Sequence, residues 1–368
     1  TEETIPLPGK DASRTITLHK VDLEHFSILS NAEEDFLRKA AFRLSKVFGA
    51  YKQHFGVARN KDAKIKVIVF NSMPEYYAAL GNTIKNPAFY LPEKKLICAG
   101  CDVAAYKATI AEVRREHEGL DRALREWKRK LTEARAEVAA QVGKAYDYAK
   151  RTGDRGALED ATAAQRRWQV QVGQMEKQVT EIHNLIFSLN RRNDMAFTDY
   201  TKRLFATLYH EGFHAFADTF LFPEGKMMEV PRWLNEGLAQ YFEGARIEGD
   251  RLILGQEDRA KMAFLRQCRR EGGLVQLDRM MTGGPNEYMI QDMADVEKST
   301  KHYLQAWAMT HLLAERGRLT RETLDAYAKL LQEKKPPLEA LSNLAGLTPQ
   351  ELDAAWAAKL EPRFGLDK

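Results

Sequence analysis

Residues 208–218 read LYHEGFHAFAD, and the two histidines in this stretch, His210 and His214, are four positions apart. On an α-helix this spacing puts both imidazole rings on one face, one turn apart, where they can converge on a single metal ion. Glu211 points about 100° around the helix from His210. That direction suits a carboxylate that holds a water molecule at an open coordination position rather than a metal ligand. The alternative interpretation is a buried pair of histidines with a structural role.

A third metal ligand is expected on a second helix within residues 231–243, which read PRWLNEGLAQYFE. A catalytic zinc site uses three protein ligands and one exchangeable water. Glu236 follows His214 by 22 positions (236 − 214 = 22). The loop between the two helices contains turn-forming residues, namely Pro223, Gly225 and Pro231. Such a loop lets the second helix run back past the first, so that Glu236 can join His210 and His214 as a metal ligand.

The stretch Trp233–Ala239, WLNEGLA, resembles the third-ligand helix of the gluzincin metallopeptidases, the clan of thermolysin-like and aminopeptidase-N-like enzymes. The resemblance implies that His210, His214 and Glu236 ligate Zn²⁺. It also implies that Glu211 is the general base, which takes a proton from the attacking water and passes it to the leaving amine. The chain is therefore expected to be a zinc metallopeptidase that acts on a peptide or protein substrate.

A hydrogen-bond donor for the tetrahedral oxyanion is also implied, because the metal ion alone does not satisfy that charge. In aminopeptidase-like relatives this donor is a tyrosine on a later helix. Tyr303 follows Glu236 by 67 positions (303 − 236 = 67) and is the first candidate, with His302 and His311 behind it. The alternative is that Tyr303 only packs its ring in a helix that also carries Trp307.

Residues around the ligands are expected to support them. Zinc-bound histidines usually donate their other N–H to an acceptor, and Gln240 and Asp218 are candidates for that role, although each could instead be solvated or cap a backbone group. Gly212 costs roughly 1 kcal/mol inside a helix, which indicates close approach by another element. A strand pair at 88–91 and 95–98 could offer an edge on which an extended peptide aligns.

The order of elements from HFSILSNA at 25–32 to YLQAW at 303–307 resembles a group of bacterial peptidase-MA-like domains, apart from residues 102–195. The resemblance implies a mostly helical α+β fold: a gluzincin-like catalytic core with a small N-terminal sheet, a long inserted antiparallel coiled-coil hairpin and a helical C-terminal region. The expected segments are 1–101, 102–195, 196–250 and 251–368. The Gly-x-Met-Glu-Asn signature of aminopeptidases is absent before His210, which favours an endopeptidase.

The N-terminal hundred residues alternate strand and helix signals. Alternating and β-branched runs predict strands at 16–20, 24–30 and 64–70, and the Pro-containing stretch from Pro87 to Cys98 predicts a hairpin. Asn31 is expected to cap a helix that runs to about Phe55, and a short helix is expected at 73–80.

From residue 102 to 193 apolar positions step by alternate threes and fours, a heptad seam with a break at Arg151–Gly156. Two helices of roughly 40 residues should fold back into an antiparallel hairpin about 60 Å long. The hairpin could be a spacer, or it could bind a partner, self-associate or shield a site. A separate helix is then expected at Thr198–Phe220, a short strand at 251–254, and C-terminal helices broken at Gly272, Gly283 and Pro336.

The composition argues against nucleic-acid binding and against a transmembrane protein. The chain carries 56 basic and 52 acidic residues, a formal net charge of +4, without an arginine- or lysine-dense block, so nucleic acid is not an expected partner. No apolar run reaches the roughly 18 residues of a transmembrane span. The chain starts at Thr1 rather than Met, and the resembled group is commonly exported, so a periplasmic or extracellular protein is expected.

Two further functions remain open at this stage. The first is a zinc-containing scaffold with little catalytic activity that binds a partner through the helical hairpin. The second is an oxidoreductase that uses Cys98 and Cys101, which form the only CxxC pattern among the three cysteines. That pair could equally be structural thiols, a local disulfide or half of a metal site.

Overall fold

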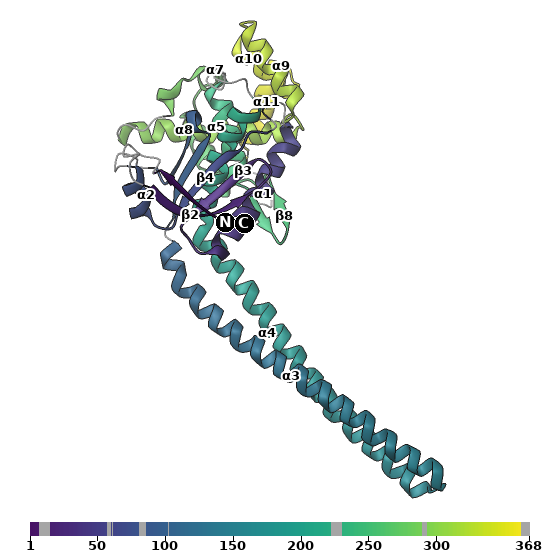
Figure 1. Ribbon diagram of the computed structural model, residues 1–368. Helices are drawn as coiled ribbons and strands as arrows, with labels where there is room; N and C mark the ends of the chain where they lie inside the picture. The colour runs from purple at the N-terminus through teal and green to yellow at the C-terminus, as the bar shows by residue number, and fades with distance from the viewer. Residues whose placement is uncertain are drawn as a thin grey trace. The chain divides into compact units, whose positions relative to one another are not determined.

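The structure, a computed structural model, describes residues 1–6, 15–56, 60, 62–80, 86–101, 103–221, 230–288 and 293–361. The chain divides into two compact units. We call Thr1–Asp102 together with Lys202–Lys368 the core unit, and Val103–Thr201 the hairpin unit. Helices predominate, and the principal sheet lies in the N-terminal part of the core unit (Figure 1). The fold is therefore a mostly helical α+β fold with a small N-terminal sheet and long helices.

The core unit contains a six-stranded sheet with the strand order β1-β2-β3-β4-β6-β5. Strands β3, β4 and β6 are parallel, and the other neighbouring pairs are antiparallel. The strands are β1 (Glu2–Pro6), β2 (Thr15–Asp22), β3 (Phe26–Ser30), β4 (Ile65–Phe70), β5 (Ala88–Leu91) and β6 (Leu96–Gly100). The strands predicted at 16–20, 24–30 and 64–70 and the hairpin before Cys98 are confirmed, whereas β1 was not predicted.

The central strands β3 and β6 are buried along their whole length because helices cover both faces of the sheet. One face packs on α2 (Met73–Leu80), where Leu29, Ile68 and Cys98 lie in one buried cluster with Tyr76 of the helix. The predicted helix at 73–80 is confirmed. β5 lies at the end of the sheet and presents a strand edge to the rest of the core unit.

Helix α1 (Glu34–Phe55) begins later than the sequence predicts, because Asn31 does not cap it. The N-cap position is Glu33. The Asn31 side chain instead accepts a hydrogen bond from the main-chain N–H of Asn71 at 2.9 Å. Asn31 and Asn71 follow the parallel strands β3 and β4, so this side chain ties the two strand ends together rather than starting the helix.

Helix α4 (Arg155–Phe216) is one continuous helix, so the predicted separate helix starting at Thr198 is wrong. The Thr198 hydroxyl donates to the carbonyl of Asp194 one turn earlier, at 2.8 Å, as a threonine inside a helix does. No proline or glycine stands between Asn193 and His210 to break the helix. A π-helical segment, Ala217–Leu221, follows it.

The hairpin unit consists of α3 (Val103–Thr152) and the first part of α4, which run antiparallel beside each other (Figure 1). Gly153 adopts a positive φ of 68° in the turn, and Asp154 Oδ1 accepts the N–H of Gly156 at 2.9 Å to start α4. Ion pairs join the two helices at Arg135 with Glu176 and at Arg192 with Glu116. The predicted helical hairpin and its turn are confirmed.

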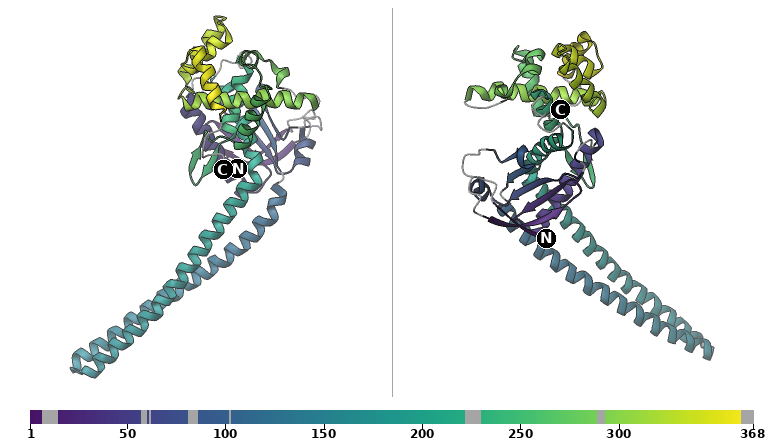
Figure 2. Two further views of the ribbon diagram at one scale, coloured as in Figure 1. Left: turned by 180° about the vertical axis from the view of Figure 1, so that it is seen from behind. Right: turned by 45° about the horizontal axis from the view of Figure 1, so that its top comes forward.

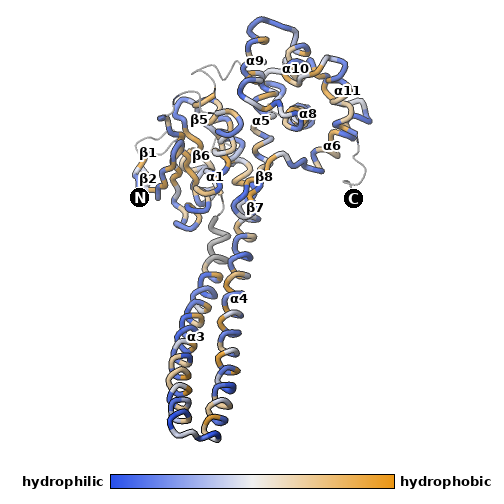
Figure 3. Tube along the Cα trace, turned by 90° about the vertical axis from the view of Figure 1, so that its right-hand side faces the viewer, coloured by the Kyte–Doolittle hydropathy of each residue, from blue (hydrophilic) through white to orange (hydrophobic). Residues whose placement is uncertain are grey.

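Hydrophobic positions recur along both helices of the hairpin unit among hydrophilic ones (Figure 3). Four predicted seam residues are buried: Leu131, Ala161, Ile182 and Leu189. Leu158, which was also predicted in the seam, is 45% exposed. It lies in the first turn of α4, next to the loop, where the hairpin ends.

The C-terminal part of the core unit is helical, with one short hairpin of β7 (Arg246–Glu248) and β8 (Arg251–Ile253). Its helices lie together at one end of the core unit, and the sheet lies toward the other (Figure 2). They are α5 (Arg232–Glu243), α6 (Arg259–Arg270), α7 (Leu277–Thr282), α8 (Met293–Glu315), α9 (Arg321–Gln332), α10 (Pro337–Ala345) and α11 (Pro349–Lys359). The breaks predicted at Gly272, Gly283 and Pro336 are confirmed, whereas β7 was not predicted.

Helices α5 and α8 pack at very close range. A Cβ atom on Gly237 would lie 2.4 Å from Thr310 Oγ1 and 2.6 Å from the Ala306 carbonyl oxygen. Only glycine therefore fits at this crossing. The helix that carries Tyr303 and Trp307 thus packs against the helix that carries Glu236.

Among the residues that the structure describes, no helix is both long and apolar enough to cross a membrane.

Candidate metal centre

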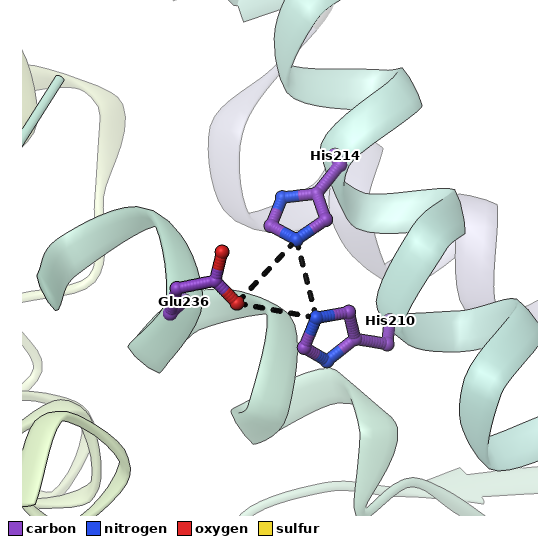
Figure 4. A group of neighbouring side chains, drawn as sticks. All are labelled: His210, His214 and Glu236. Carbon is purple, nitrogen blue, oxygen red and sulfur yellow. Dashed lines mark hydrogen bonds and ion pairs between the residues drawn. The ribbon is translucent and has the colours of Figure 1, made fainter. Parts of the chain in front are cut away.

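The three predicted ligands meet at one point, although they come from two helices (Figure 4). His210 and His214 lie on the last turns of α4, and Glu236 lies on α5. His210 Nε2 is 3.2 Å from His214 Nε2 and 3.3 Å from Glu236 Oε2. His214 Nε2 is 3.7 Å from the same carboxylate oxygen. The three atoms thus form a small triangle of two nitrogens and one oxygen, which we call the metal triangle.

This triangle has the size of one face of a zinc coordination tetrahedron. Ligands placed tetrahedrally at about 2.0–2.1 Å from zinc are about 3.3–3.4 Å from one another. The observed separations of 3.2, 3.3 and 3.7 Å bracket that value. Two imidazoles and one carboxylate also match the donor set of a catalytic zinc site, which leaves its fourth position open. The residues present therefore fit a zinc ion.

Aromatic packing fixes the turns of α4 that carry the histidines. Tyr51 of α1 is fully buried, and its hydroxyl donates to the carbonyl of Tyr209 at 2.6 Å. A Cβ on Gly212 would lie 3.4 Å from the Tyr51 hydroxyl and 3.5 Å from Phe48, so α1 approaches the helix closely there. The close approach predicted from Gly212 is confirmed. Because α1 packs on one side, the histidines face α5.

Both histidines are held through their second ring nitrogens. His210 Nδ1 lies 3.0 Å from Glu243 Oε2, and His214 Nδ1 lies 3.1 Å from Asn235 Oδ1. Each oxygen accepts a ring N–H, which leaves the lone pair on Nε2 free for a metal ion. The sequence analysis missed Asn235 and Glu243. Their positions one before and seven after Glu236 on the same helix were the available signal.

Gln240 and Asp218, the residues predicted to support the histidines, are bound elsewhere. The Gln240 amide donates to the main-chain carbonyl of Tyr303 at 2.9 Å, which ties α5 to α8. Asp218 accepts a hydrogen bond from the Tyr90 hydroxyl at 2.7 Å. Both predictions of histidine support are wrong, because each side chain reaches a neighbouring element rather than an imidazole.

Glu211 is not part of the group formed by His210, His214 and Glu236, although its charge acts on His210. Its Oε2 accepts the main-chain N–H of Tyr90 at 2.9 Å. That N–H belongs to β5, the strand at the end of the sheet, so the edge of β5 faces the part of α4 that carries Glu211. The carboxylate, the strand edge and the three ligands therefore lie in one region of the core unit.

Tyr303 also lies in this region. Burial, and next the negative charge of Glu236, raise the pKa of Tyr303 to about 12, while Arg232 beside it acts in the opposite direction. The hydroxyl therefore stays protonated at neutral pH and can donate a hydrogen bond. Its ring packs edge-on against Tyr288, with centroids 5.0 Å apart. Tyr303 thus has both a packing contact and a polar environment beside the metal triangle.

The two alternative oxyanion donors have other surroundings. His302 is buried, and its Nδ1 lies 2.9 Å from the carbonyl oxygen of Lys298 on the same helix. His311 packs between the rings of Tyr241 and Trp307, with centroid separations of 5.1 and 4.6 Å. The charge of Glu236 is among the causes of the pKa shift of Tyr303 and is not among the causes of that of His311.

The pKa values of His210 and Glu236 depend strongly on each other's charge. Burial alone would lower the pKa of His210, but hydrogen bonds with Glu236 and Glu243 outweigh it and raise that pKa to about 10. Burial alone would raise the pKa of Glu236, but hydrogen bonds with His210 and His214 outweigh it and hold that pKa well below its ordinary value. The site is thus a buried carboxylate that is balanced by positive charge, which a divalent cation can supply.

The cysteines offer little support for thiol chemistry. No disulfide joins the three cysteines, which all lie in the described part of the chain, and Cys98 is buried in the sheet. Burial raises the pKa of the Cys98 thiol to about 12, so it stays protonated and unreactive at neutral pH.

Comparison with known proteins gives one finding. Neither a curated protein nor a solved structure matches the chain. Residues 204–339 match a protein family described as "Protein of unknown function (DUF1570)". The matched residues contain the three ligands of the metal triangle together with Glu211 and Tyr303, and they exclude the hairpin unit.

Proposed function

We propose that the protein is a zinc-dependent metallopeptidase with a gluzincin-type core that hydrolyses peptide bonds within a peptide or protein substrate. The observation that carries the proposal is the metal triangle: His210, His214 and Glu236 place their ligand atoms within 4.8 Å of one another. A carboxylate that is not a ligand, Glu211, lies beside them. This combination of three ligands and one separate carboxylate is what metal-assisted hydrolysis requires.

A bound zinc ion would polarise the scissile carbonyl and lower the pKa of water. Glu211 accepts the proton of the attacking water and then delivers it to the leaving amine. The Tyr90 N–H holds the Glu211 carboxylate at 2.9 Å and so fixes its direction. The carboxylate must lie within hydrogen-bond reach of the water that it deprotonates, and this contact limits its rotation.

The remaining groups orient the substrate. Apart from the Tyr90 N–H, which is bonded to Glu211, the outer edge of β5 would offer its main-chain groups to an extended peptide, which would add to the sheet as one more strand. The Tyr303 hydroxyl, protonated at neutral pH, donates to the oxyanion that forms on the scissile carbonyl. Endopeptidase activity is favoured because a strand edge binds a chain along its length rather than by its end.

The test of this proposal is the substitution Glu211→Gln, assayed with an unfolded protein substrate. The amide cannot take a proton, so hydrolysis should fall by about 10²–10⁴-fold, the usual contribution of a general base. Metal content should not change, because Glu211 is not a ligand. Parent protein treated with a chelator provides the metal-free control. Unchanged hydrolysis by the Glu211→Gln variant would refute the mechanism.

We also propose a second, different function: a zinc-containing binding protein that engages a partner through the hairpin unit. This proposal is supported by large apolar side chains that are exposed on α4 of that unit, with exposed fractions of 62% for Val170, 55% for Leu185 and 70% for Phe187. The two functions differ in turnover. A binding protein would contain stoichiometric zinc and leave an unfolded substrate uncut at every chelator concentration.

A further inference from the structure

The two oxygens of the third ligand have different partners. Glu236 is 2% exposed, so each carboxylate oxygen must find its partner within the protein. Its Oε2 faces the two imidazoles, 3.3 Å from His210 Nε2 and 3.7 Å from His214 Nε2. Its Oε1 forms an ion pair with Arg232 Nη2 at 2.8 Å, a separation typical of charge-assisted contacts between a guanidinium and a carboxylate. One oxygen is thus directed at the metal position and the other is held away from it.

A carboxylate can bind a metal ion through one oxygen or through both. If both oxygens of Glu236 bound the metal, the second would take the position that a catalytic zinc site keeps for exchangeable water. A hydrogen bond between a guanidinium and a carboxylate is charge-assisted and is about twice as strong as a neutral one. Arg232 therefore opposes rotation of Oε1 toward the metal.

Arg232 is well placed to resist such rotation. It is the first residue of α5, and Glu236 lies one turn further along the same helix, so the contact is made within one rigid element. The Arg232 guanidinium also lies close enough to Tyr303 to lower the pKa of that hydroxyl. Part of its side chain, 39%, remains exposed, so the charge is not isolated from solvent.

We propose that Arg232 is a positioning residue that restricts Glu236 to a single ligating oxygen and thereby keeps one metal coordination position open. This inference rests on the proposed function, because it presumes that the three ligands hold zinc. The ion pair of Arg232 is with the Glu236 oxygen that does not face the two imidazoles. Its effect is on the number of atoms that surround the metal ion.

The experiment measures coordination rather than catalysis. X-ray absorption of the zinc-loaded protein counts the nitrogen and oxygen neighbours of the metal, and visible absorption of the cobalt-loaded protein separates four-coordinate from five-coordinate sites. Arg232→Met and Arg232→Ala remove the guanidinium, and Arg232→Lys keeps a cationic donor. Thermal unfolding identifies any variant that does not fold. If one of Arg232→Met and Arg232→Ala does not fold, the other is used for the measurement.

The matched control is Arg321→Met. Arg321 is the first residue of α9, and its Nε lies 2.8 Å from Asp325 Oδ2 one turn further along that helix. The pair reproduces the helix position, the spacing and the distance of the Arg232–Glu236 pair. Asp325 is 59% exposed and belongs to no metal-ligating group in the described part of the chain. Losing this ion pair should leave the metal spectra unchanged.

The proposal predicts one additional oxygen neighbour and a five-coordinate cobalt spectrum in both truncated variants, with zinc still bound. Arg232→Lys and Arg321→Met should keep the spectra of the parent. Four-coordinate spectra in a folded, metal-loaded Arg232→Met or Arg232→Ala variant would overturn the inference, and so would loss of the metal from the folded variants. Failure of the parent protein itself to bind zinc would instead contradict the proposed function.

Discussion

The main-chain N–H of Tyr90 on β5 donates a hydrogen bond to Glu211 Oε2 on α4 over 2.9 Å. The same residue uses its side chain for a second link, because its hydroxyl donates to Asp218 Oδ2 at 2.7 Å. Glu211 and Asp218 are seven positions apart, two turns along the end of α4. One residue of the edge strand therefore fixes both the proposed general base and the helical segment that carries it.

Removing the Tyr90 hydroxyl should weaken this link without disturbing the main-chain contact. We expect Tyr90→Phe to lower the free energy of unfolding by about 1.5–3 kcal/mol, because the lost hydrogen bond has a charged acceptor. Asp218→Asn should have a smaller effect, since its amide oxygen still accepts from Tyr90. Denaturant unfolding of Tyr90→Phe, Asp218→Ala and the double variant checks this, and strictly additive effects would show that the hydroxyl and the carboxylate do not interact.

The acceptors behind the histidines should control metal affinity. Glu243→Ala removes the oxygen that lies 3.0 Å from His210 Nδ1. Such acceptors fix the ring orientation and tautomer, so we expect zinc to bind about 10–100-fold more weakly. Competition with a chromogenic chelator measures the affinity. Glu248→Ala, at an exposed position on β7, is the control, and equal zinc affinity in the two variants would argue against a supporting role for Glu243.

Glycine at position 237 should be essential to the packing of α5 on α8. Gly237→Ala places a methyl group where Thr310 Oγ1 would lie only 2.4 Å away, so the helices must separate. We expect a loss of about 1–3 kcal/mol in the free energy of unfolding, the usual cost of overpacking. Gly143→Ala is the control, because no described atom lies within 4 Å of the added Cβ. There alanine should stabilise the helix by up to about 1 kcal/mol. Equal effects at both positions would contradict the close crossing.

The stability of the core unit should depend on His311 below neutral pH. Burial, and next the charge of Lys359, lower the pKa of His311 from 6.5 to about 4. The unfolded chain protonates His311 more readily than the folded protein does. The contribution of His311 to the free energy of unfolding is therefore complete above about pH 6.5 and is lost as pH falls toward 4. At 1.36 kcal/mol per pKa unit, the free energy of unfolding falls by roughly 3 kcal/mol in total over this pH range.

The variant His311→Phe keeps an aromatic ring between Tyr241 and Trp307 but cannot bind a proton. Its free energy of unfolding should therefore fall less steeply with acid than that of the parent between pH 6.5 and 4. His183→Gln, at an exposed position of the hairpin unit, controls for loss of a histidine. Identical pH profiles for parent and His311→Phe would contradict this assignment.

Sequence patterns predicted the helices and strands that depend on interactions between residues close together in the chain. The β-branched run at 64–70 forms β4, and the stepping of apolar residues through Leu131 and Ile182 forms the hairpin. The pairing of His210 with His214 follows from helix geometry alone. The approach of Glu236 was expected from the turn-forming residues between the two helices, of which 222–229, including Pro223 and Gly225, lie outside the described residues.

Contacts between distant parts of the chain were harder to predict. Asn31 has the chemistry of a helix cap, but it bonds to Asn71, 40 positions away. Gln240 and Asp218 were assigned to the histidines by helical spacing, yet each bonds to a residue on another element, whereas Asn235 and Glu243 take that role. Which polar neighbour a side chain reaches depends on how helices pack, and spacing along one helix does not determine it.

The measurement that most directly tests the central claim is the metal content of the purified chain by elemental analysis, compared with three variants that each lack one ligand. We predict one zinc per chain in the parent, and loss of stoichiometric zinc in His210→Ala, His214→Ala and Glu236→Ala under the same dialysis. A folded parent without stoichiometric metal, or a Glu236→Ala variant that retains as much zinc as the parent, would contradict the claim that these three side chains form a metal centre.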